Sequence, residues 1–204
     1  VDEAIECVLR ILSILAAGHQ LSLHHRDLKP DNVIVRGGKW VDPVLVDLGI
    51  AWHGSSSDKG FSTPADRELG NRFLRLPEFA PGGEHRDPRS DLAMAAGLLF
   101  YMLSGRAPRV LVDHEGRHPH EVTPTPMRAG VLEDRRWARL SGLLRVAFQQ
   151  RMEHRFRDAD EFSSHLAELN KDPLVAADDL ELEVARFREL TESSVARERA
   201  ESAP

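Results

Sequence analysis

Apolar side chains recur at helical spacing in several parts of the chain. In residues 2–18 they fall on one face of a helix, and Gly18 is placed to end it. Residues 91–105 are apolar on nearly every side, which predicts a helix buried in the centre of the domain. Two shorter faces predict further helices near the end of the domain. They consist of Trp137, Leu140, Leu144, Ala147 and Phe148, and of Phe162, Leu166 and Leu169.

Two short β-branched runs, NVIVR at 32–36 and PVLVD at 43–47, predict strands. Turn-forming glycines lie between them, so the two strands are expected to pair as a hairpin. Residues 52–72 are rich in Ser, Gly and Asp and have little periodicity, which predicts a long surface loop. The proline-containing stretch 106–131 predicts another loop. The expected fold is therefore mainly α with a small β-hairpin element.

The last part of the chain differs from the rest in its charge pattern. From about residue 171 acidic and basic residues alternate, and a narrow apolar stripe predicts an amphipathic helix outside the compact body. We therefore divide the chain into a domain at 1–170 and a charged helical tail at 171–204. The stripe covers too few heptads to decide between a coiled coil or partner helix and a helix packed on its own lobe. Its residues are Leu180, Val184, Phe187 and Leu190.

Charge and cysteine usage exclude several classes of protein. The net charge of −6 comes from acidic and basic residues that are mixed along the chain, which is not the footprint of a nucleic-acid-binding protein. The single cysteine, Cys7, rules out a disulfide framework and reads as a packed core thiol, which fits a cytoplasmic location. No apolar run approaches the roughly 18 residues of a membrane span. The first residue is Val, which suggests a fragment of a longer protein.

The polar stretch 25–32, HRDLKPDN, concentrates the groups that phosphoryl transfer requires. That reaction needs a carboxylate to accept a hydroxyl proton, a cation to hold the moving phosphoryl charge, and oxygen ligands for Mg²⁺. Asp27 is the candidate base and Lys29 the candidate cation. The side-chain oxygens of Asn32 and of Asp47, at the end of the second strand, are the candidate metal ligands.

These residues match the catalytic-loop pattern of protein kinases at every fixed position, and Asp47-Leu48-Gly49 follows at hairpin spacing. The chain therefore resembles a eukaryotic-type Ser/Thr protein kinase of the kind also found in bacteria. The Leu-Pro-Glu that ends at Glu78 is similar to the Ala-Pro-Glu that closes the activation segment of that family. Asp91 opens the buried helix as in the family's SDxxxxG signature, although Ala96 replaces the glycine. Arg155 resembles the late arginine that pairs with that glutamate.

The resemblance spans about residues 4–169 and implies the large, C-terminal lobe of a kinase. It implies ATP and Mg²⁺ as cofactors and Ser/Thr hydroxyls of protein substrates as acceptors. Lys29 favours Ser/Thr over Tyr, and Lys29, Asn32 and Asp47 would contact the nucleotide and its metal. Structural or regulatory roles are implied for His25, Arg26, Leu48, Gly49, Glu78, Asp91 and Arg155.

The small, ATP-clamping lobe is expected to be absent from this chain. The sequence has no GxGxxG loop and no strand with a VAIK-type lysine ahead of the catalytic loop. An active enzyme would need that lobe in cis, as upstream sequence. The alternative is a non-catalytic pseudokinase lobe that acts as a binding or scaffold module. Asn71 also replaces a threonine that helps to position the base in the family.

Two further segments carry candidate chemistry. Residues 52–72 are a candidate activation loop that phosphorylation would order through Arg26. The alternative is that its serines merely form a solvated loop. Its candidate acceptors are Ser55, Ser56, Ser57, Ser62 and Thr63. The stretch DHEGRHPH, with His114, His118 and His120, lacks a regular metal-ligand spacing, so an exposed polar loop is expected there rather than a metal site.

Overall fold

A computed structural model of the chain describes every residue except 48–72, 81–86, 123, 125–126 and 170–204. Its described part is built on the helices α1 (Asp2–Gln20), α2 (Arg89–Ser104), α3 (Trp137–Ala147) and α4 (Ala159–Glu168). A compact unit spans Val1–Glu168, and Leu169–Pro204 forms a second unit. The following residues and segments named above lie outside the described residues: Leu48, Gly49, Asn71, the loop 52–72 and the tail from 170 onward.

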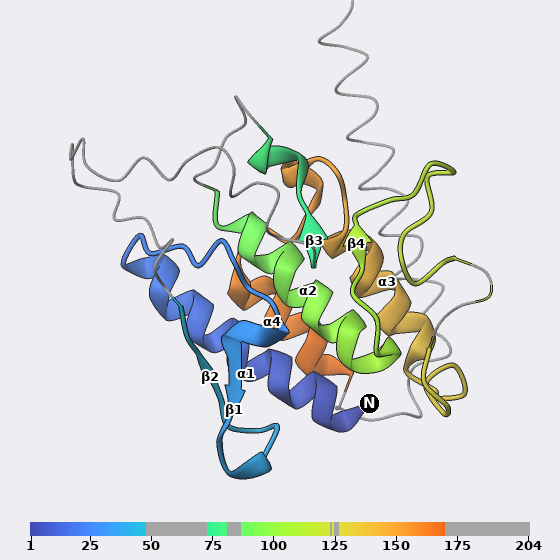
Figure 1. Ribbon diagram of the computed structural model, residues 1–204, viewed down its shortest axis with the longest axis horizontal. Helices are drawn as coiled ribbons and strands as arrows, with labels where there is room; N and C mark the ends of the chain where they lie inside the picture. The colour runs from blue at the N-terminus through green and yellow to red at the C-terminus, as the bar shows by residue number, and fades with distance from the viewer. Residues whose placement is uncertain (48–72, 81–86, 123, 125–126, 170–204) are drawn as a thin grey trace, which may run out of the picture. The chain divides into compact units, whose positions relative to one another are not determined.

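Helix α2 forms the centre of the compact unit, as its all-round apolar sequence predicts. Nearly all of its side chains are buried, and it packs against α1, α3 and α4 (Figure 1). The helix ends at Gly105, which has the left-handed backbone conformation (φ 76°) and whose N–H donates to the carbonyl oxygen of Tyr101. Glycine takes this conformation without a steric penalty, so Gly105 is a favourable end for the helix.

Helix α1 packs against α2, α4 and strand β2 (Pro43–Leu45). Its buried face includes Ile5, Val8 and Leu12. The prediction that Gly18 ends this helix is wrong, because α1 continues to Gln20. A glycine stops a helix when it leaves the helical conformation, and here the left-handed residue after the helix is Ser22 (φ 59°). The carbonyl oxygen of Gly18 instead accepts the N–H groups of Leu21 and Leu23, both at 2.9 Å.

Cys7 lies within the buried face of α1, as predicted for a core thiol. Burial raises the pKa of this thiol to about 11. The thiolate is the reactive form of cysteine, so Cys7 is unreactive at neutral pH.

The predicted hairpin is present. Strands β1 (Val33–Val35) and β2 (Pro43–Leu45) pair antiparallel, with Val33 opposite Leu45 (Figure 1). A short 3₁₀ turn, Pro30–Asn32, leads from the predicted catalytic loop directly into β1. A second 3₁₀ turn, Arg36–Gly38, starts the reversal, where Gly37 and Gly38 have positive φ. The hairpin therefore joins the end of the catalytic loop to Asp47.

A second, two-stranded sheet was not predicted. Strand β3 (Leu74–Arg75) pairs in parallel with β4 (Arg109–Val110), which lies inside the stretch expected to be a loop. With two residues in each strand, neither leaves an alternating pattern in the sequence. The segment after β3 forms a 3₁₀ turn, Pro77–Phe79, and another such turn, Met152–His154, precedes α4.

The histidine-rich stretch differs from the expected exposed loop. His114 is exposed, but His118 and His120 are buried, with their rings stacked at a centroid distance of 5.8 Å. Both rings also lie within aromatic contact distance of Phe148. Although the stretch is polar in composition, the rings of His118 and His120 are part of the buried core.

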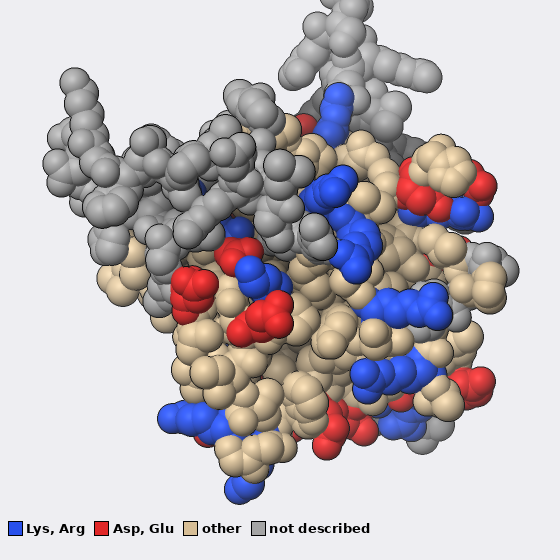
Figure 2. Space-filling view, in the orientation of Figure 1, with Lys and Arg blue, Asp and Glu red and all other residues tan. Residues whose placement is uncertain are grey.

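The surface carries both signs of charge. On the face in Figure 2, Lys and Arg side chains lie among acidic and neutral ones, and neither sign covers the face. Within the described residues, no helix combines the length and apolar character that a membrane crossing requires.

Candidate active site

The carboxylate of Asp27 is the centre of the predicted catalytic loop. Asp27 is 8% exposed, and its Oδ2 accepts hydrogen bonds from Lys29 Nζ at 2.6 Å and from Asn32 Nδ2 at 3.1 Å. Asn32 Nδ2 also donates to the backbone carbonyl oxygen of Asp27 at 2.7 Å. Two side chains thus hold this carboxylate in one orientation, and its Oδ1 carries none of these hydrogen bonds.

Asn32 and Asp47 lie at the same end of the hairpin. The N–H of Val46 donates to the carbonyl oxygen of Asn32 at 3.0 Å. Asn32 directly precedes β1 and Asp47 follows β2, so the two candidate metal ligands lie at neighbouring ends of paired strands. The amide nitrogen of Asn32 donates both of its hydrogen bonds to Asp27, so the amide oxygen is left to bind a metal ion. This orientation of the amide group is assigned from the hydrogen bonds. Asp47 is exposed. An amide oxygen and an exposed carboxylate are ligand types that fit Mg²⁺, which binds few protein oxygens and keeps water or phosphate oxygens as its other ligands.

Two residues of this region have an unusual backbone conformation. Arg26, which precedes the predicted base, and Asp47 both have positive φ, 64° and 61°. A residue with a Cβ pays a steric cost in this conformation, and such residues concentrate at functional sites. Arg26 turns the chain one residue before the predicted base, and Asp47 is itself a predicted metal ligand.

Asp91 fixes the backbone of the predicted catalytic loop. It lies in the first turn of α2, and its carboxylate accepts the backbone N–H groups of His25 at 2.9 Å and of Arg26 at 2.8 Å. His19, at the end of α1, adds a contact from its Nε2 to Oδ2 at 2.9 Å. The buried helix therefore holds the two residues that precede Asp27. His25 itself is buried, and neither of its ring nitrogens has a hydrogen-bond partner among the described residues.

Glu78 and Arg155 form the expected ion pair although 77 residues separate them. Arg155 Nη1 donates to Glu78 Oε1 at 2.5 Å and Nη2 to Oε2 at 3.1 Å, while Ser90 Oγ donates to Oε1 at 2.7 Å. Arg155 also donates to the carbonyl oxygens of Gln149 and Gln150. Burial alone would raise the pKa of Glu78, but the hydrogen bond and charge of Arg155, together with the hydrogen bond from Ser90 and a backbone hydrogen bond, outweigh it and the pKa is lowered.

Sequence reasoning named most of these groups and missed others. Ser90, His24 and His19 were not assigned any role. Ser90 stands directly before Asp91, so the Ser-Asp pair of the signature holds Glu78 with one residue and the catalytic loop with the next. The signature was therefore the available signal for Ser90, whereas nothing local marks His24.

The sequence of the chain is similar to those of known bacterial proteins. No protein-family model matches the chain. The chain is 35% identical over 107 residues to the probable serine/threonine-protein kinase PknB of Lactococcus lactis, which covers 52% of the chain and 16% of that protein. It is 28% identical over 166 residues to the probable serine/threonine-protein kinase PknB of Bifidobacterium longum, which covers 79% of the chain and 23% of the relative. The chain thus spans about a quarter or less of these relatives.

Solved structures give the same result for the fold. The crystal structure of the Mycobacterium tuberculosis PknI kinase domain superposes with a TM-score of 0.56 and 24% identity, over 84% of this chain and 57% of that one. At this identity the likeness concerns the fold alone. The fold is that of the large lobe of a protein kinase, and the chain's homologues are bacterial Ser/Thr protein kinases, which confirms the resemblance seen in the motifs.

Proposed function

We propose that the protein transfers the γ-phosphoryl group of ATP to Ser or Thr hydroxyls of protein substrates, and that this chain is its catalytic lobe. In this proposal Asp27 accepts the proton of the attacking hydroxyl. Lys29 then holds the charge of the moving phosphoryl group. Asn32 and Asp47 supply the oxygen ligands of the Mg²⁺ that accompanies the nucleotide.

The arrangement around Asp27 carries the proposal. Its carboxylate is hydrogen-bonded by Lys29 and Asn32 and lies in a loop whose backbone is held by Asp91. Phosphoryl transfer depends on positioning and charge neutralisation more than on covalent catalysis. A base fixed from several sides, with a cation and a metal ligand in direct contact with it, meets that requirement.

Lys29 has two roles in this account. Without substrate its ammonium group bonds Asp27 Oδ2 at 2.6 Å, which keeps two opposite charges paired where the chain is only partly exposed to water. When the phosphoryl group arrives, its negative charge competes for the ammonium group. Lys29 can then turn from Asp27 to the phosphate, since its long side chain is flexible and carries three donors.

The remaining ATP contacts would come from a small lobe in cis, encoded as upstream sequence. That lobe would supply the glycine-rich loop and the lysine that hold the nucleotide phosphates. The homologues named above are Ser/Thr protein kinases, which supports protein hydroxyls as the acceptors.

The test is Mg²⁺-dependent transfer of labelled phosphate from ATP to a Ser/Thr peptide by the full-length gene product. The Asp47→Asn variant should need at least ~10-fold more Mg²⁺ for half-maximal rate, because a carboxylate ligand is lost. Asp42→Asn, at the opposite end of the hairpin, is the matched control and should behave as wild type. A protein that folds but transfers no phosphate would instead be a non-catalytic binding module.

A further inference from the structure

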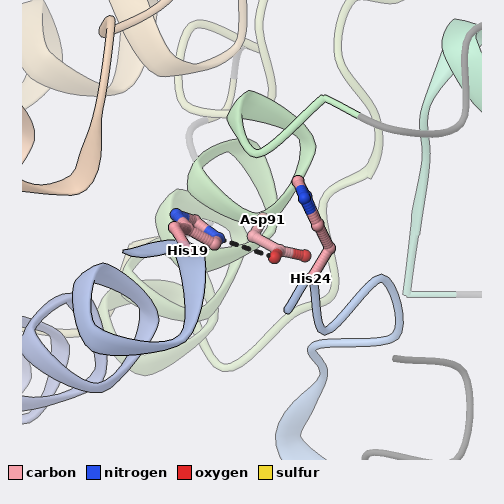
Figure 3. Close-up of side chains that lie close together, drawn as sticks. All are labelled: His19, His24 and Asp91. Carbon is pink, nitrogen blue, oxygen red and sulfur yellow. Dashed lines mark hydrogen bonds and ion pairs between the residues drawn. The ribbon is translucent and has the colours of Figure 1, made fainter. Parts of the chain in front are cut away.

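Three potential metal ligands meet behind the catalytic loop, away from the groups assigned to catalysis. They are His19 at the end of α1, His24 in the loop and Asp91 in the first turn of α2. One ligand atom from each lies within 4.8 Å of the other two. Figure 3 shows the two imidazole rings on either side of the Asp91 carboxylate, each coming from a different segment of the chain.

Each of the three groups has a donor atom suited to a cation. Nδ1 of His24 is buried and has no hydrogen-bond partner among the described residues. Nε2 of His19 already faces Asp91 Oδ2 at 2.9 Å. That oxygen also accepts the N–H of His25, and Oδ1 accepts the N–H of Arg26, so the carboxylate is fixed by the backbone and stays in place when a cation arrives.

The electrostatics also allow a cation. Burial lowers the pKa of His24, against the opposing effect of Asp91, so its imidazole is neutral at pH 7 and able to coordinate. Arg26 and Asp87 also act on the pKa of His24, with opposite signs.

We propose that His19, His24 and Asp91 form a binding site for a divalent transition-metal ion of the Zn²⁺ class. Two imidazoles and one carboxylate are a ligand set that Zn²⁺ uses, with a fourth position left for water. Tetrahedral bonds of about 2.0 Å require ligand atoms about 3.3 Å apart, so the cluster would have to contract by about 1.5 Å at most. Mg²⁺ prefers oxygen ligands and does not fit this set.

Occupation of this site would tie three separate segments together. The cation would replace the direct contact between His19 and Asp91 and add His24 as a third connection, between α1, the catalytic loop and α2. His24 precedes Asp27 by three residues, so the bound cation would stiffen the loop that carries the proposed base. The site itself does not depend on the phosphoryl-transfer proposal, and binding can be measured in a protein that transfers no phosphate.

Co²⁺ is the probe, because its visible absorption reports both binding and tetrahedral geometry. The untagged chain is titrated with Co²⁺ in the presence of millimolar Mg²⁺ and then with Zn²⁺. His24→Ala and His24→Gln remove the third ligand and leave both backbone hydrogen bonds to Asp91 intact. His114→Ala, whose side chain is 86% exposed, is the matched control. Circular dichroism establishes that every variant is folded.

The proposal expects one Co²⁺ per chain with tetrahedral absorption, displaced by Zn²⁺ and unaffected by Mg²⁺. Both His24 variants should bind at least ~10-fold more weakly, since even groups outside the direct ligand shell contribute 10- to 100-fold to metal affinity. His114→Ala should bind as wild type. Absence of Co²⁺ absorption in the wild-type chain would overturn the proposal. Equal affinity in wild type and a folded His24 variant would also overturn it and would assign the binding to other surface histidines.

Discussion

Replacing Glu78 by Gln isolates the contribution of the buried ion pair to stability. Glu78 and Arg155 side chains are 4% and 0% exposed, so neither charge can find water if its partner is lost. Gln keeps the shape of Glu but removes the negative charge. Its amide oxygen can still accept one hydrogen bond from Arg155, whereas its NH2 group places donors where the second carboxylate oxygen accepted. Arg155 would also keep its hydrogen bonds to the carbonyl oxygens of Gln149 and Gln150, but no negative charge would compensate its own.

The expected loss is ~3–5 kcal/mol of unfolding free energy, which is typical for an uncompensated charge left in a protein interior. In a domain of this size, 1 kcal/mol corresponds to a Tm shift of about 2–4 °C, so the Tm should fall by roughly 10 °C. The Arg155→Met, Glu78→Leu double variant removes both charges. It should be less destabilised than the sum of the two single variants, because no unpaired charge remains.

The assay is thermal and urea unfolding of wild type, Glu78→Gln and a surface control at pH 7. The control is Asp42→Asn, which breaks the Arg36–Asp42 pair, where the two side chains are 65% and 46% exposed. Water replaces such a contact, so the control should unfold with wild type. The reasoning is refuted if Glu78→Gln unfolds with wild type as well.

The pH dependence gives an independent check on the same pair. The pKa of Glu78 is lowered in the folded protein, so the ionised carboxylate stabilises the fold at pH values above its ordinary pKa of 4.5. As the pH falls below that value, the unfolded chain binds a proton that the folded protein resists. Wild type should therefore lose its advantage over Glu78→Gln progressively as the solution is acidified.

Two further predictions concern stability alone. Burial lowers the pKa of His120 to about 4, so the unfolded state takes up a proton first as the pH falls. Wild type should lose ~3 kcal/mol of unfolding free energy between about pH 6.5 and 4, and His120→Leu should flatten that slope in urea titrations; an unchanged slope would contradict it. Gly105→Ala should cost ~1–2 kcal/mol in the same assay, because alanine must adopt φ 76° at the end of α2; no loss would contradict the capping role.

The features that follow from local sequence were predicted correctly. Two β-branched runs on either side of glycines predicted the hairpin, which the structure contains. The all-round apolar sequence of residues 91–105 predicted the buried helix, which is α2. The Glu78–Arg155 pair was reached only through family motifs. No local periodicity connects residues that far apart.

The features that were missed arise from tertiary packing. His118 and His120 read as surface residues by type, but packing against Phe148 outweighs their polarity. The residues next to strands β3 and β4 pack closely on α2, where a Cβ at Gly97 would lie 3.1 Å from Phe73 and 3.4 Å from Pro108. The convergence of His19 and His24 on Asp91 likewise depends on how α1 and α2 cross, which sequence spacing does not encode.

The rate of phosphoryl transfer by an Asp27 variant tests the central claim most directly. Full-length wild type, Asp27→Asn and Asp31→Asn are compared in single-turnover transfer from Mg²⁺·ATP to a Ser/Thr peptide. Asp31 lies in the same loop but is exposed, so it controls for the loss of a nearby negative charge. The account predicts a rate reduced by 10²–10⁴-fold or so in Asp27→Asn and a wild-type rate in Asp31→Asn. Equal rates in Asp27→Asn and wild type would contradict it.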